Sequence, residues 1–228
     1  EDAAGLLRGV LAGGRPTLFL YPKMMLNDAS VATTRDVASL VVRPGEARVC
    51  RRGDDVTLVS WGATVPLADR AATALEGAGV SVELLDLRSH SPWDTEAVLR
   101  SVRKTRKLVV VHEDNLRAGF GAEVVATVSE HAGVPVSVRR VARPDTHVPC
   151  NYVNQLALLP SVRRVLEAVA PMVGLEVHEL VRDSGAAGSF QLEAVGSSPA
   201  DQNVTVVEWR VREGESVHAG DPIAECEA

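Results

Sequence analysis

Val56-Thr-Leu-Val-Ser60 and Lys107-Leu-Val-Val-Val-His112 are two short apolar runs, each typical of a strand buried on both faces. Between them the pattern changes to helical spacing. A helix is predicted to begin at Thr64 and to end near Gly77, since glycine commonly follows the last helical turn. The next apolar run, 80–85, predicts another strand. Buried strands that alternate with helices in this way predict a mostly parallel sheet covered by helices on both faces.

The same alternation continues toward residue 170. Ser91 is expected to cap a helix, with a proline in its first turn, and a further helix is predicted over 121–131. The run 134–141 predicts a strand near the sheet edge, because Pro135 cannot donate a ladder hydrogen bond. A last helix is predicted over 161–170, with one apolar face directed inward.

The regions on either side of this core have a different character. Residues 1–50 offer one predicted helix over 2–11 and one predicted strand over 17–20, which cannot bury enough apolar surface to form a domain. The stretch Ser184-Gly-Ala-Ala-Gly-Ser189 has the composition of a flexible linker. The interpretation is therefore one central domain with a partial segment before it and a linker after it.

Near the C-terminus the sequence alternates strictly, with Val207, Trp209 and Val211 between charged residues. Gly214 and the Gly220-Asp-Pro222 segment supply two turns, and together these features resemble the first half of a lipoyl or biotinyl carrier domain. In that family the modified lysine lies at the following hairpin tip. No lysine occurs after Lys107, so lipoate is not expected to be attached to these 228 residues. Half of such a barrel would leave strand edges open, so completion by another segment or chain is expected.

Composition excludes several classes of partner. A net charge of −6, without a basic run, argues against nucleic acid. No apolar run reaches the roughly 18 residues of a membrane span. The three cysteines are far apart and form no zinc or disulfide motif, and the N-terminus has no signal-peptide pattern, so a cytoplasmic location is expected.

Several ordered motifs together resemble a known family. These are Gly53-Asp-Asp-Val-Thr-Leu-Val-Ser-Trp-Gly62, Leu85-Asp-Leu-Arg-Ser-His-Ser-Pro-Trp-Asp94, Val109-Val-Val-His-Glu113, Gly119-Phe-Gly-Ala-Glu123 and Arg143-Pro-Asp-Thr-His-Val-Pro149. They resemble the C-terminal domain of the beta subunit of 2-oxoacid dehydrogenase first components, in the transketolase superfamily. The resemblance implies an α/β fold with a mostly parallel five-stranded sheet and helices on both faces.

The resemblance also divides the chain. It implies that residues 1–50 are the C-terminal remnant of a pyrimidine-binding domain and that 51–170 are the transketolase-like C-terminal domain. Residues 171–188 would be a linker, and 189–228 a partial, all-β lipoyl-like module.

The cofactor expected from the resemblance is thiamine diphosphate with Mg²⁺. The family holds it through a Gly-Asp-Gly motif, but Gly53-Asp-Asp55 and Gly220-Asp-Pro222 both lack the second glycine. The cofactor is therefore expected on a thiamine-binding partner subunit, in a heterotetramer, or on a region outside these residues. No catalytic, cofactor-binding or metal-binding residue is assigned to this chain.

Four residues are candidates for a site. Lys23 follows a predicted strand, where superfamily members that use sugar phosphates bind the substrate phosphate, although a solvated lysine explains it as well. His112 and Glu113 end a strand and could lie at an interface or at the edge of an active site, or be ordinary hydrogen-bonded residues. Arg88 also follows a strand and could bind an anion or form a structural ion pair.

The function implied by the resemblance is transfer of a two-carbon acyl unit to a lipoyl arm. The donor would be a pyruvate-type 2-oxo acid or a ketose phosphate, and the arm could pass the unit onward to an acyl carrier protein. The chain would be a subunit of the enzyme and not catalytic alone. The alternative is a non-catalytic assembly module that docks a thiamine enzyme and presents a carrier.

Overall fold

The computed structural model describes residues 1–26, 32–33, 36–180, 205–218 and 221–227. These residues form two compact units. The larger unit comprises residues 1–147 and 158 onward to the end of the described segment at 180, and it contains the sheet. The smaller unit comprises residues 148–157 and the described residues after 204.

The larger unit is built on a five-stranded sheet in the order β1-β3-β2-β4-β5. Its strands are β1 (Arg48–Arg51), β2 (Val56–Ser60), β3 (Val82–Asp86), β4 (Lys107–Asn115) and β5 (Ser137–Arg143). β2 pairs in parallel with β3 and β4, and β4 pairs in parallel with β5, whereas β1 is antiparallel to β3. The expected mostly parallel, five-stranded α/β fold is confirmed.

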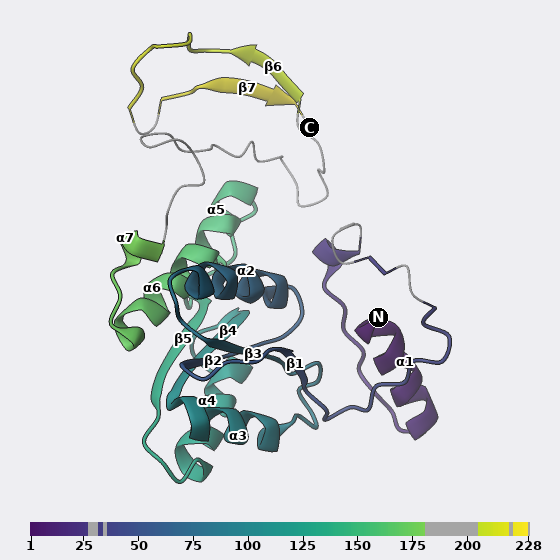
Figure 1. The fold of residues 1–228 in the computed structure, drawn as a ribbon. Coiled ribbons are helices and arrows are strands. Elements are labelled where there is room, and N and C mark those ends of the chain that lie inside the picture. The colour runs from purple at the N-terminus through teal and green to yellow at the C-terminus, as the bar shows by residue number, and fades with distance from the viewer. Residues whose placement is uncertain (27–31, 34–35, 181–204, 219–220, 228) are drawn as a thin grey trace. The chain divides into compact units, whose positions relative to one another are not determined.

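Helices cover both faces of the sheet (Figure 1). α2 (Thr64–Gly77) and α6 (Val162–Val173) cover one face, and α3 (Thr95–Thr105) and α4 (Phe120–His131) cover the other. All five residues of β2 are buried, as a central strand with helices on both faces requires. Val109 and Val111 belong to the core beneath α2 and α6, while Leu108 and Val110 belong to the core beneath α3 and α4.

Local chemistry explains where the helices begin. Ser161 caps α6, and its side-chain oxygen accepts a hydrogen bond from the Arg164 amide at 3.2 Å. The prediction that Ser91 caps α3 is wrong. Asp94 is the cap, and its carboxylate accepts a hydrogen bond from the Ala97 amide at 2.9 Å. Asp94 also accepts a hydrogen bond from the Ala47 amide at 3.0 Å, so the same carboxylate caps α3 and holds the chain before β1.

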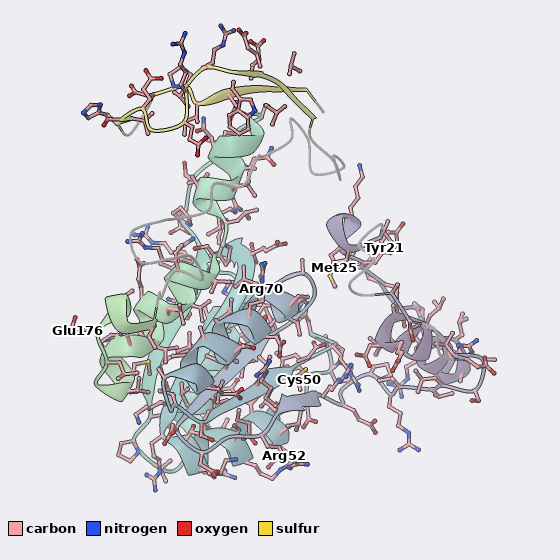
Figure 2. The ribbon with its side chains drawn as sticks, turned by 45° about the horizontal axis from the view of Figure 1, so that its top comes forward. Tyr21, Met25, Cys50, Arg52, Arg70 and Glu176 are labelled. Atoms are coloured by element: carbon pink, nitrogen blue, oxygen red, sulfur yellow. The ribbon has the colours of Figure 1, made fainter. Side chains whose placement is uncertain are left out.

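The N-terminal segment contributes α1 (Asp2–Gly13) and the short 3-10 helix η1 (Lys23–Met25). The strand predicted over 17–20 is wrong for the described chain, because no backbone hydrogen bond joins it to another described segment. Leu18 and Leu20 are 83% and 74% exposed, so the apolar side chains that suggested a strand have no core to enter. Tyr21 precedes η1, and Met25 is the last residue of η1 (Figure 2).

The described residues after the last sheet strand are mostly helical. α7 (Val177–Leu180) follows α6, and Leu180 is buried against the core that α2 and α6 cover. In the smaller unit, α5 (Tyr152–Leu158) begins beside Asn151, and β6 (Thr205–Trp209) pairs antiparallel with β7 (Ala224–Glu227). Gly214 lies between these strands with φ +84°, as its predicted turn requires. The second predicted turn, at Gly220, lies outside the described residues.

No helix among the described residues has both the length and the apolar character needed to cross a bilayer.

Candidate functional site at the carboxyl edge of the sheet

The carboxyl ends of β2, β3 and β4 meet at one edge of the sheet, because these three strands are parallel. The side chains that follow them are Trp61 after β2, Arg88 and His90 after β3, and His112 within the end of β4. Open parallel sheets place ligand and active sites at this edge. This edge is therefore the candidate functional site.

Four rings gather at this edge, and we refer to Trp61, His90, His112 and Phe120 as the aromatic cap. The His112 imidazole stacks on the Trp61 indole, with ring centroids 5.2 Å apart and an interplanar angle of 14°. His90 lies edge-on to Trp61 at 5.0 Å and 4.6 Å from the Phe120 ring. Phe120 begins α4, so the cap joins the end of the sheet to the first turn of that helix.

Two glycines at the start of α4 make room for the His112 ring. A Cβ at Gly121 would overlap the Nε2 atom of His112, and a Cβ at Gly119 would lie 3.0 Å from its Cε1 atom. Any side chain at Gly121 would therefore displace the imidazole. The Gly119-Phe-Gly121 motif thus serves close packing of α4 against a histidine, and neither glycine has a positive φ.

His112 is fully buried, and neither of its ring nitrogens has a hydrogen-bond partner among the described residues. Buried polar groups are normally paired, so this ring is an exception that requires a physical reason. Burial lowers the pKa of His112, Asp114 opposes that shift, and Arg140 and His90 add to it. Partial desolvation also lowers the pKa of His90. The cap therefore favours neutral imidazoles.

Arg88 lies beside the cap and is tied to the N-terminal segment. Its Nη2 atom lies 2.6 Å from the Asp2 carboxylate, and its backbone amide donates to Asp86 at 2.9 Å. Its φ of +59° is uncommon for a residue with a Cβ. Burial raises the pKa of the Asp86 carboxyl, and the Arg88 charge opposes that shift. In this structure Arg88 forms a structural ion pair, while its buried Nε atom has no partner among the described residues.

Comparison with known proteins identifies the family of this domain. Residues 45–165, more than half of the chain, match the family model described as transketolase, C-terminal domain. The chain belongs to the transketolase C-terminal domain family. The matched range contains the whole five-stranded sheet and every residue of the aromatic cap.

Curated relatives of this transketolase C-terminal domain are beta subunits of 2-oxoacid dehydrogenase first components. One is the 2-oxoisovalerate dehydrogenase subunit beta 2, mitochondrial, of Arabidopsis thaliana, 36% identical over 76% of this chain and 48% of the relative. Another is the pyruvate dehydrogenase E1 component subunit beta of Bacillus subtilis, 33% identical over 73% of this chain and 53% of the relative. The chain therefore spans about half the length of the curated relatives that it matches.

A solved structure supports the same family. It is described as a split gene transketolase, inactive beta4 tetramer, and superposes with a TM-score of 0.53 at 29% identity. The superposition covers 60% of this chain and 44% of the chain in that structure. The chain is thus homologous to subunits of thiamine diphosphate-dependent enzymes.

The four residues singled out by sequence occupy different places. His112 and Arg88 lie together at the carboxyl edge, whereas the Glu113 side chain is exposed, with partial desolvation raising the pKa of its carboxyl. Lys23 is exposed in η1, and its ammonium makes no hydrogen bond or ion pair with a described residue. The sequence did not single out Trp61, His90 or Asp2. Trp61 directly follows a strand and His90 lies shortly after one, so their positions could have drawn attention to them.

The chemistry available at this edge is limited to what imidazoles, carboxylates and a guanidinium can do. No group of three or more histidine, cysteine, aspartate or glutamate side chains among the described residues is arranged to hold a metal ion. The described residues therefore contain no such metal-binding cluster, and we derive no step through the family's cofactor in this chain.

Proposed function

We propose that this chain acts as part of the beta component of a thiamine diphosphate-dependent, 2-oxoacid dehydrogenase-like or transketolase-like system. The observation that carries the proposal is the match over residues 45–165, which coincides with an intact five-stranded sheet and its packed carboxyl edge. The beta-subunit relatives extend that similarity to about three quarters of the chain.

The exposed apolar side chains of the N-terminal segment support the proposal that another protein surface covers this segment. Leu11, Leu18, Leu20 and Leu26 are between 61% and 83% exposed. Several large apolar side chains exposed within one short segment favour an interaction surface in a soluble protein. The stretch 16–21 is neither helix nor strand and has no sheet partner among the described residues. In the proposal, residues 1–50 are the end of a pyrimidine-binding domain whose other surface covers these side chains.

The cofactor in this proposal belongs to a thiamine-binding partner subunit or to a region outside these residues, and the assembly is a heterotetramer. When bound, thiamine diphosphate supplies the carbanion chemistry that detaches an acyl unit from a 2-oxo acid or a ketose. The contribution of this chain is to support that partner and to fix the N-terminal segment against the carboxyl edge through Asp2 and Arg88.

The acceptor in this proposal is a lipoyl arm. Support comes from the alternating sequence of the tail and from the antiparallel pairing of β6 with β7. Trp209 is 68% exposed on β6, as expected for a strand pair that lacks the rest of its module. The lysine that carries lipoate would lie outside this chain, and an acyl carrier protein would be a final acceptor. A pyruvate-type 2-oxo acid and a ketose phosphate are the two donors to compare.

The test is reconstitution of the full chain with a thiamine diphosphate-binding alpha-type subunit. The mixture is supplied with pyruvate or a phosphorylated ketose as donor and with free lipoamide as acceptor. The product that is measured is S-acyl dihydrolipoamide. Donor-dependent acylation that needs both chains would support the proposal. A control with the partner alone shows how much product this chain adds.

A stable complex that forms without any donor-dependent product would favour the second function, a non-catalytic module that docks a thiamine enzyme. The observation in favour of that function is the exposed β6–β7 pair, whose sequence resembles a carrier fragment. Absence of any complex with the alpha-type subunit would overturn both functions.

A further inference from the structure

The His112 ring is held by packing alone. It is fully buried between the Trp61 indole and the first turn of α4, yet neither nitrogen is hydrogen-bonded within the described residues. A neutral imidazole tolerates such a place at the modest cost of leaving its polar atoms unpaired. An imidazolium does not tolerate it, because a buried charge without partners costs far more.

The Asp114 carboxylate, which can accept a hydrogen bond from a protonated imidazole, lies close by, beside Gly119. A Cβ built at Gly119 would be 3.0 Å from the His112 Cε1 atom and 3.1 Å from the Asp114 Oδ2 atom. The Asn115 carbonyl oxygen is closer still to that Cβ, so His112, Asp114 and this oxygen converge beside Gly119. Asp114 is exposed, and its other oxygen accepts a hydrogen bond from the Asn115 amide at 2.7 Å.

We propose that His112 is a proton-operated latch on the aromatic cap. The neutral ring stacks on Trp61 and closes the cap, whereas the protonated ring turns past the Asn115 carbonyl oxygen toward the Asp114 carboxylate and leaves the stack. The proton comes from solvent and returns to it, so no covalent bond is made or broken. This device belongs to the chain itself and does not depend on the proposed function.

The charges around the ring determine the direction of the response. Asp114, on β4, attracts the imidazolium, whereas Arg140 on β5 and His90 before α3 repel it. The β2 side contributes the uncharged Trp61, and the first turn of α4 contributes Phe120 and two glycines. Desolvation is the largest influence and keeps the ring neutral under ordinary conditions. The latch therefore opens only at a pH below the titration of an exposed histidine.

Opening would change what the carboxyl edge presents. Loss of the His112 stack uncovers one face of the Trp61 indole, and His90 and Phe120 lose a neighbour in the same cluster. The core beneath α3 and α4 begins directly below these rings, with Val59 and Val124 fully buried. The change is therefore confined to the cap unless the whole domain unfolds.

The experiment follows Trp61 fluorescence in the full chain carrying Trp93→Phe and Trp209→Phe, so that one indole reports. Emission is measured between about pH 8 and about pH 5, the range in which histidines titrate. The expected result is a reversible, one-proton change whose midpoint lies below 6.5, the ordinary pKa of a histidine. His112→Gln should abolish that change, and the matched control His131→Gln should leave it unaltered.

A second substitution keeps the test informative if His112→Gln destabilises the fold. Asp114→Asn alters an exposed side chain, and removing its charge should move the Trp61 midpoint to lower pH with no change in far-ultraviolet circular dichroism at pH 8. His90→Asn should retain the change and move its midpoint upward, because His90 repels the proton on His112.

Several results would overturn the latch. One is a fluorescence change that persists in His112→Gln, or that vanishes in His90→Asn, because His90 would then be the reporter. Another is an Asp114→Asn midpoint equal to that of the unsubstituted chain. Loss of circular dichroism at the same midpoint as the fluorescence change would show global acid unfolding in place of a local opening.

Discussion

The Asp2 carboxylate lies 2.6 Å from the Arg88 guanidinium, and this pair fixes the start of α1 to the loop that follows β3. Asp2 also pairs with Arg48 at 2.8 Å, so one carboxylate compensates two cations. A backbone hydrogen bond of 2.9 Å from Val42 to Gly5 fastens the other side of α1. Asp2 therefore links the start of α1 to both Arg48 and Arg88 by ion pairs.

Replacing Asp2 by Asn should loosen α1. The change retains the size of the side chain but leaves the Arg88 guanidinium, whose side chain is only 15% exposed, without its counter-charge. We expect a loss of about 1 to 2 kcal/mol in the free energy of unfolding, less than for a fully buried pair. Chemical denaturation measures it, and hydrogen exchange at Val42 should accelerate. The control Glu167→Gln breaks the exposed pair with Arg163 and should change stability by less than about 0.5 kcal/mol.

Adding a methyl group at Gly121 should be costly because it meets the His112 ring. A Cβ there would overlap the imidazole, so Gly121→Ala forces the ring or α4 to move, at a cost of about 1 to 3 kcal/mol. The control is Gly77→Ala at the end of α2, where no atom lies within 4 Å of the added Cβ. That change should be neutral or slightly stabilising, since alanine is the better helix former.

The same pair can be tested as a double-mutant cycle. In a His112→Ala background the ring is absent, so Gly121→Ala should lose most of its cost, and a coupling energy above about 0.5 kcal/mol is expected. Equal costs of Gly121→Ala in both backgrounds would mean that the methyl group meets another part of the structure.

The sequence predicted the central strands well because their apolar runs are continuous, as burial on both faces requires. Val56–Ser60 and the residues around Val110 carry that signal themselves. β1 was missed because Arg48–Arg51 has no apolar run, and its strand conformation comes from pairing with β3. The strand predicted over 17–20 failed for the opposite reason, since its apolar residues have no described partner.

The candidate site was predictable only in part. His112 and Arg88 stood out because each follows or ends a strand, and both lie at the carboxyl edge. The aromatic cap was not predictable, because its rings come from the connections after β2 and β3, the end of β4 and the start of α4, which only the folded sheet brings together. Nor could the sequence show that the neighbour of Gly121 is the His112 imidazole, because that contact exists only in the folded structure.

Lys23→Ala distinguishes the two acyl donors of the proposed system. If Lys23 binds the phosphate of a ketose phosphate, its removal should raise the KM for that donor about tenfold, as loss of one charge-assisted contact predicts. The KM for pyruvate, which has no phosphate, should remain unchanged. The reconstituted enzyme is assayed with both donors, and Arg70→Ala on the exposed face of α2 serves as the control cation. Equal effects on both donors would remove the phosphate-binding role.

The folding stability of the chain should fall as pH decreases through the histidine range, because burial holds the pKa of His112 below its ordinary value of 6.5. The unfolded chain then binds the proton more tightly than the folded chain. The stabilising contribution of the neutral ring is present above pH 6.5 and is lost as pH falls toward the lower, folded-state pKa. His90 has the same sign, whereas Asp86, whose pKa is raised from 3.8 by burial, acts in the opposite direction and at lower pH.

The measurement is the free energy of unfolding by urea at several values between about pH 8 and about pH 5.5, for the unsubstituted chain and for His112→Gln. The slope should be steeper in the unsubstituted chain, by at most about 1.4 kcal/mol per pH unit, the limit for one proton. His131→Gln should retain the steep slope, because His131 is exposed at the end of α4. Parallel curves for the unsubstituted chain and His112→Gln would mean that His112 takes up its proton equally in the folded and unfolded states, which its burial beneath Trp61 and Gly121 argues against.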